Sequence, residues 1–154
     1  MDIDTRNRII SAVLAVVIIG LAWLLYDSIT SPYEQVEQQR EVTEQVRHRM
    51  TVVREALVQY QRREEGFPET LDDLVEWLKT NEEMVEHGDS LFAFRPPHEY
   101  DPDSVIYSPR TGNRFEYARN DTIRPNIYLL EDPDTDDRIG SLERTNLLNA
   151  TNWN

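Results

Sequence analysis

The uncharged stretch from Ile9 to Tyr26 constrains this chain most. It reads IISAVLAVVIIGLAWLLY, and only Ser11 and Gly20 dilute its apolar side chains. An α-helix of this length rises about 27 Å, close to the bilayer hydrocarbon thickness of about 30 Å. A surface helix of a globular protein needs a polar face, which this stretch lacks. We therefore expect a transmembrane helix at 9–26. A cleaved signal peptide is the alternative, although its apolar region usually covers only about 7–15 residues.

The charges on either side of this stretch indicate its orientation. Arg6 and Arg8 precede it, and the first basic residue after it is Arg40. Positive residues concentrate on the cytoplasmic side of membrane spans, and aromatic residues concentrate at the membrane interfaces. We expect residues 1–8 to be cytoplasmic, Trp23 and Tyr26 to lie at the outer interface, and the rest to be periplasmic or extracellular. The membrane would be the inner, or cytoplasmic, membrane.

Residues 27–65 are predicted to form a linker and a long stalk helix. The segment Ser31-Pro32-Tyr33-Glu34 fits a capping box that starts a new helix, but one continuous helix kinked at Pro32 fits equally well. An apolar stripe then follows at helical spacing, formed by Val46, Met50, Val53, Leu57 and Tyr60. We expect this stripe to pack against a sheet of the same chain, since tertiary packing is the usual source of helix stability.

The segment 66–142 is predicted to be an α+β domain outside the cytoplasm. We expect Gly66 to end the stalk helix in a left-handed conformation and Pro68 to prevent its continuation. Thr70 is the expected N-cap of a short helix that ends near Thr80, before a polar turn. The apolar face of this helix consists of Leu71, Leu74, Val75 and Leu78.

After Ser90 the pattern changes to that of β-strands. Strands are expected at 91–95, 105–107, 114–118 and 126–130, with SPRTGN as a hairpin-type turn between the second and the third. Together they predict a small antiparallel β-meander of three or four strands, packed on the stalk helix. Residues 143–154 are expected to form a C-terminal tail or arm, which is polar apart from Leu147, Leu148 and Trp153. The predicted fold class is therefore α+β.

The stretch VREALVQYQRREEGFPETLDDLV, residues 53–75, resembles the type IV pilins and pseudopilins. It is similar to their pattern of a helix end, a Tyr, a Gly-x-Pro break and a following short helix. The resemblance implies an N-terminal membrane helix that runs into a long amphipathic helix, then a loop and a small antiparallel sheet. No prepilin leader motif precedes the span and no Glu lies inside it, so we expect the architecture, rather than the polymer, to be shared.

The acidic stretch EDPDTDDRIGSLE, residues 131–143, is a candidate calcium site. Counted from Asp132, the residues Asp134, Asp136, Arg138 and Glu143 occupy positions 3, 5, 7 and 12 of an EF-hand loop, with Arg138 contributing its backbone carbonyl. The resemblance adds support, since some pseudopilins hold calcium in a C-terminal loop. Position 6 is Asp137, where the motif has Gly. A solvated acidic turn, in which Asp side chains cap their own backbone, is the alternative.

The composition narrows the classes of function. A net charge of −13 makes nucleic acid a poor partner, and the absence of cysteine excludes disulfides and thiolate metal sites. We find no set of nucleophile, base and oxyanion donors, and so predict no catalytic activity. The favoured function is a single-span accessory subunit that contacts other membrane subunits through its span, Ile9 to Tyr26, and its outer domain. A pseudopilin-like component of a secretion or pilus-type fibre is the alternative.

Overall fold

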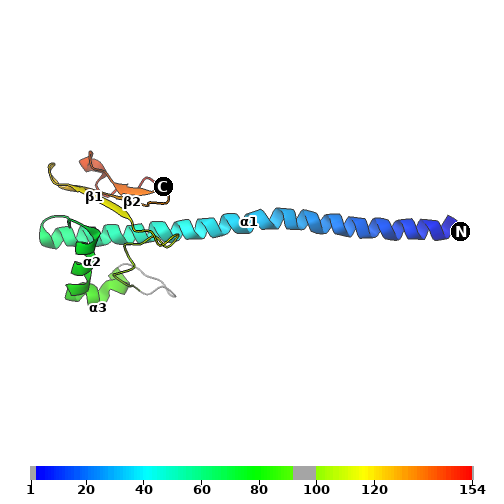
Figure 1. The fold of residues 1–154 in the computed structure, drawn as a ribbon, viewed down its shortest axis with the longest axis horizontal. Helices are drawn as coiled ribbons and strands as arrows, with labels where there is room; N and C mark the ends of the chain where they lie inside the picture. Colours follow the sequence, from blue (N-terminus) through cyan, green and yellow to red (C-terminus); the bar gives the residue numbers. More distant parts are fainter. Residues whose placement is uncertain (1–2, 92–99, 154) are drawn as a thin grey trace. The chain divides into compact units, whose positions relative to one another are not determined.

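The structure, a computed structural model, divides the chain into two compact units, Met1–Glu41 and Val42–Asn154. It describes residues 3–91 and 100–153, with the side chains within them except those of residues 3–5, 27–35, 87 and 89–91. The elements are α1 (Ile3–Glu64), α2 (Leu71–Thr80), α3 (Glu82–Leu91), β1 (Glu116–Asn120), β2 (Ile127–Glu131), β3 (Arg138–Gly140) and a 3-10 turn at Thr145–Leu147 (Figure 1). The fold is therefore α+β.

The first helix, α1, is continuous from Ile3 to Glu64. Of the two interpretations of Ser31–Glu34, a new helix and a single continuous one, the structure has the second. The helix ends at Glu64, close to the expected position, but it is Glu65 that adopts the left-handed conformation, with φ of 58°. The prediction that Gly66 takes this conformation was wrong.

The short helix α2 begins as the sequence predicts. The Thr70 side chain accepts a hydrogen bond from Asp73 N, and the Asp73 carboxylate accepts one from Thr70 N, which makes a reciprocal capping box. Leu71, Leu74 and Leu78 are buried, and Val75 is 8% exposed. These four residues are the apolar face that the spacing indicated.

A further helix, α3, replaces the polar turn that was expected after Thr80. Asn81 links the two helices, since its N–H donates to Trp77 O and its side chain accepts from Met84 N at 3.3 Å. Met84 is 1% exposed and anchors α3 in the core. Leu91, placed in a strand from the sequence, is the last residue of α3, and residues 92–95 of that expected strand lie outside the described residues.

The sheet is a three-stranded antiparallel meander in the order β1-β2-β3. A small antiparallel meander is the type of sheet that the sequence predicted. The strands β1 and β2 lie within two residues of the expected segments 114–118 and 126–130. The expected strand at 105–107 is reduced to one bridge between Tyr107 and Arg114, closed by the bond from Ser108 N to Asn113 O at 2.7 Å. The strand β3 was not expected, because it lies inside the segment interpreted as a calcium loop.

One hydrophobic cluster joins the elements of the second unit. It includes the predicted α1 positions Val46, Met50, Val53 and Leu57, all fully buried, and Tyr60 packs at its periphery. The sheet and the loop before it contribute Val105, Phe115, Tyr128, Leu130 and Ile139. Figure 1 shows β1 and β2 on one side of this part of α1. The helices α2 and α3 lie on its other side (Figure 1).

Candidate functional site

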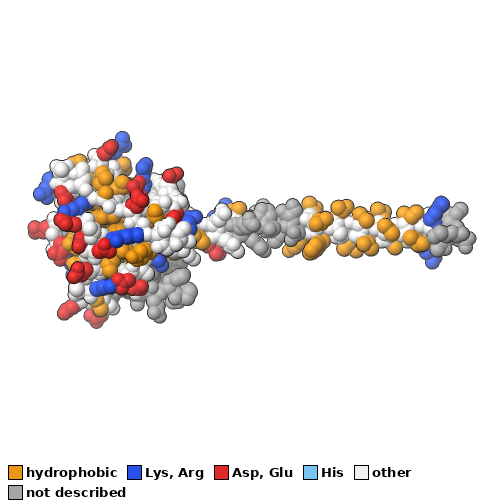
Figure 2. All heavy atoms as spheres, viewed as in Figure 1, with side chains coloured by type: hydrophobic (Ala, Val, Ile, Leu, Met, Phe, Trp, Pro, Cys, Tyr) orange, Lys and Arg blue, Asp and Glu red, His pale blue; other side chains and the backbone are white. Residues whose placement is uncertain are grey.

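Most of the exposed large apolar side chains in the described part of the chain lie on α1. The helical segment Arg6–Tyr26 contains an 18-residue window with a mean hydropathy of 2.7, and none of the residues in that window is buried. Trp23 is 70% exposed and Tyr26 is 69% exposed. Figure 2 shows apolar side chains along this segment, whereas charged side chains of both signs cover the second unit. By length and composition this helix qualifies as a membrane span, a test that a signal sequence also passes.

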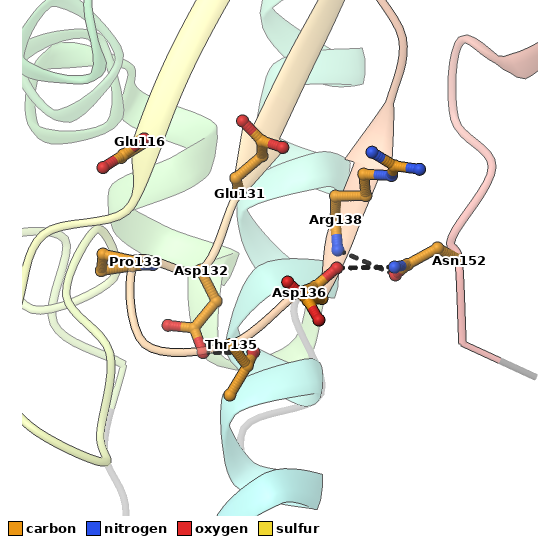
Figure 3. Close-up of a pocket in the computed structure, with 8 residues that line it drawn as sticks. All are labelled: Glu116, Glu131, Asp132, Pro133, Thr135, Asp136, Arg138 and Asn152. Atoms are coloured by element: carbon orange, nitrogen blue, oxygen red, sulfur yellow. Dashed lines mark hydrogen bonds between the residues drawn. The ribbon is translucent and has the colours of Figure 1, made fainter.

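The acidic loop forms a second candidate site, between β2 and β3. Asp132 N donates to Asp137 O at 3.0 Å, which closes the loop, and Thr135 Oγ1 donates to Asp132 Oδ2 at 2.8 Å. The loop borders a hollow of about 370 Å³ whose lining includes Glu116, Glu131 and Asp136 (Figure 3). Asp132 is 2% exposed, and its Oδ1 has no hydrogen-bond partner in the described part of the chain.

Two of the five predicted calcium ligands have other contacts through the atoms that calcium would need. The Asp134 carboxylate accepts hydrogen bonds from Thr111 Oγ1 and from Asn113 Nδ2, the latter at 2.8 Å. The Arg138 carbonyl accepts from Asn152 N at 3.1 Å, because Arg138 is the first residue of β3.

Two other predicted ligands, Asp136 and Glu143, are exposed on either side of β3. The fifth, Asp132, is held by Thr135, as described above. Within residues 3–91 and 100–153, no three His, Cys, Asp or Glu side chains form a group that could hold a metal ion. The structure therefore does not bring the predicted ligands together, and the calcium site stays a prediction of the spacing.

The residue at position 6 of the predicted loop, Asp137, has a structural role. Its carboxylate accepts from Arg47 Nε at 2.8 Å and from Arg47 Nη2 at 3.0 Å, which joins β3 to α1. The hydrogen bond to Asp137 raises the pKa of Arg47, against the effect of burial. The Arg47 guanidinium also lies over the Trp153 ring, 5.4 Å from its centroid.

Asn152 is a residue that the sequence did not single out. Its side chain accepts from Arg138 N at 2.8 Å and donates to Asp136 O at 2.6 Å (Figure 3). The backbone next to it continues the pairing, with a bridge between Ile139 and Thr151 and a bond from Gly140 N to Ala150 O at 2.9 Å. The tail thus covers the outer edge of β3. The tail has three apolar residues, Leu147, Leu148 and Trp153. Of these, Leu148 and Trp153 pack against the hydrophobic cluster.

Known proteins offer no comparison that assigns these sites. No family model, no curated protein and no solved structure matches this chain.

Proposed function

We propose that this chain is a non-catalytic subunit, anchored by one membrane span, whose second unit docks on a larger membrane complex outside the cytoplasm. One observation carries the proposal: the uncharged, apolar stretch from Ile9 to Tyr26 is helical, and none of its residues is buried in the chain itself. Apolar surface of this extent is stable in lipid or against other apolar helices. Arg6 and Arg8 at its start favour a cytoplasmic N-terminus.

The second unit suits an accessory role in this proposal. Its core is closed by the sheet, α2 and the second half of α1, so it does not depend on the span for its own hydrophobic cluster. Its surface carries charges of both signs and is suited to polar protein contacts. We interpret the part of α1 after the span as the stalk on which the meander packs.

Cysteine labelling tests this topology, because the chain has no cysteine of its own. The variants Asn7→Cys and Arg144→Cys place one thiol on each side of the proposed span, both at exposed positions. In intact cells a membrane-impermeant maleimide should label Arg144→Cys and leave Asn7→Cys unlabelled until the cells are lysed. Equal labelling of both, or release of the protein by alkaline extraction of the membranes, would overturn the proposal.

A pseudopilin-like component of a fibre is the second candidate. The order of elements, a long helix that begins apolar, then short helices and a small antiparallel sheet, favours it. Such a component should form end-on assemblies through its apolar helices. Single-cysteine variants along Arg6–Tyr26 should then cross-link copy to copy with a helical periodicity. An accessory subunit should cross-link to different proteins instead.

A further inference from the structure

A hollow with aromatic and acidic walls lies where the end of α1 meets α2 and β1. Its volume is about 480 Å³, and its lining includes Tyr60 from α1, Trp77 from α2 and Arg119 from β1. The Tyr60 and Trp77 rings meet edge to face, with centroids 5.3 Å apart and planes at 62°. Both side chains are only partly buried against the core, so part of each ring remains accessible.

The charges around this hollow are unbalanced. Four carboxylates line it, from Glu64, Glu69, Asp73 and Glu76, against the single guanidinium of Arg119. The Arg119 guanidinium forms two ion pairs, from Nη2 to Glu69 Oε1 at 3.1 Å and from Nε to Asp121 Oδ2 at 3.1 Å. Asp121 does not line the hollow, so part of the Arg119 charge is neutralised from outside it. The hollow therefore has an excess of negative charge.

The four carboxylates differ in the hydrogen bonds and ion pairs that they form within the chain. Asp73 takes part in the capping box of α2, and Glu64 accepts from the indole Nε1 of Trp77 at 3.2 Å. The exposed side chain of Glu76 has no hydrogen bond or ion pair within the described residues. Burial raises the pKa of the Tyr60 hydroxyl most, and the charges of Glu64, Asp73 and Glu69 raise it further, against the effect of Arg119.

We propose that this hollow binds an arginine side chain presented by a partner protein. A guanidinium stacks on an aromatic face and donates planar, charge-assisted hydrogen bonds to carboxylates, and the hollow provides both groups side by side. Lysine shares the charge but not the planar fork. An anionic or neutral side chain gains nothing from the four carboxylates. This inference rests on the proposed docking of the second unit and adds the chemistry of the partner.

The test is a peptide titration of the full chain in zwitterionic detergent, followed by NMR of the α2 amides and the Trp77 indole N–H. The probe is a short acetylated and amidated peptide with two arginines among glycines, compared with peptides that carry lysine or glutamate instead. The arginine peptide should give saturable shifts around the hollow. The lysine peptide should bind with a Kd that is higher by a factor of roughly three or more, and the glutamate peptide should not bind.

Two variants and one control assign the binding to the hollow. Glu76→Gln removes an exposed carboxylate without touching the core and should weaken binding roughly threefold. Trp77→Leu removes the aromatic wall and should weaken it roughly fivefold, measured on the α2 amides after the fold has been checked by its melting temperature. Glu44→Gln is the matched control, since Glu44 is exposed on α1 and does not line the hollow.

Three results would overturn the inference. One is the absence of saturable shifts, and another is equal weakening by Glu76→Gln and Glu44→Gln, which would mean attraction to net charge alone. The third is a dimer of the full chain that the arginine peptide disperses, because the arginine would then belong to a second copy. The titration needs no bilayer and no complex. A negative titration therefore does not contradict the proposed membrane topology, and a labelling result that contradicts the topology does not change the outcome of the titration.

Discussion

Arg47 and Asp137 lie 90 positions apart in the sequence and form a two-point ion pair, with N–O distances of 2.8 and 3.0 Å. The pair fixes the turn before β3 to the face of α1, next to the buried residues Val46 and Met50. It is also continuous with the tail, because Trp153 lies against the same guanidinium. One arginine therefore holds together three segments from different parts of the chain.

Removal of the charge on Asp137 should lower the stability of the second unit. We expect Asp137→Asn to reduce the free energy of unfolding by about 1 kcal/mol, because a charge-assisted pair is lost but the Arg47 side chain is 37% exposed and solvent screens it. Urea titration of the full chain in detergent measures the change. Asp103→Asn is the control, since that side chain is 64% exposed in its pair with Lys79 and should cost about 0.5 kcal/mol or less. Equal effects would show that the first pair has no special role.

The tail contact should be sensitive to a single amide. Asn152→Ala loses the bonds to Arg138 N and Asp136 O, and we expect a loss of about 1–2 kcal/mol in the free energy of unfolding. Amide hydrogen exchange at Arg138 and Gly140 should quicken most. Asn146→Ala, at an exposed position in the 3-10 turn, should leave both amides unchanged. Unchanged exchange in Asn152→Ala would mean that the tail does not protect β3.

Two glycines should respond in opposite ways to alanine. Gly140 has φ of 87°, and a Cβ there would overlap the carbonyl oxygen of Tyr128 and lie 3.1 Å from that of Leu148. We expect Gly140→Ala to cost more than about 2 kcal/mol, since strain and overlap add. At Gly66 the space is open and φ is not left-handed, so Gly66→Ala should be neutral or stabilise by up to about 1 kcal/mol. Melting temperatures of the two variants decide the matter.

High pH should destabilise the second unit through its buried tyrosine. Burial raises the pKa of Tyr128 well above its ordinary value of 10.0, and its hydroxyl donates to Asn149 Oδ1 at 2.9 Å. The neutral form is favoured in the fold, so this contribution to stability is complete below pH 10 and is lost as the pH rises from there towards the folded pKa. The urea concentration at the midpoint of unfolding, measured from about pH 7 to about pH 12, should decrease once the pH exceeds about 10. Tyr128→Phe should fall less steeply, and parallel curves would contradict the assignment.

The calcium prediction can be tested together with what the structure requires of it. For the EF-hand arrangement to form, Asp134 must leave Thr111 and Asn113. Binding should then give saturable heat and a higher melting temperature, with a stabilisation of about 2.7 kcal/mol at a hundredfold excess over Kd. Asp132→Asn and Asp136→Asn should abolish both signals, and Asp103→Asn should not. Absence of heat in the unchanged chain would end the prediction.

Local signals in the sequence predicted the helices best. The spacing of Val46, Met50, Val53 and Leu57 indicated the buried side of α1, and Thr70 with Asp73 indicated the start of α2. Their success has a physical reason, because capping and helical periodicity depend on residues within one or two turns. The helix α3 was not predicted, because Asn81 ends one helix and caps the next, and the polar residues after Thr80 were interpreted as a turn.

Long-range contacts were harder to predict from the sequence. The spacing of Asp132, Asp134 and Asp136 matched a metal loop, but β3 begins at Arg138 because its partners, β2 and the tail, come from outside the motif. The pairing of Asp137 with Arg47 and of Asn152 with Arg138 depends on segments 90 and 14 positions away, and no local pattern encodes those distances. The same holds for the hollow at Tyr60 and Trp77, which three elements build together.

The cover that residues 150–152 place on β3 limits how copies of the sheet could stack. In the part of the chain that the structure describes, β1 pairs only with β2, so its other edge is the one left for strand addition. Edge-to-edge growth of sheets into a continuous ribbon needs two open edges per molecule. Molecules with one open edge each can only pair as a dimer, in which no open edge is left. The few bonds made by the tail thus separate a self-limiting contact from a propagating one.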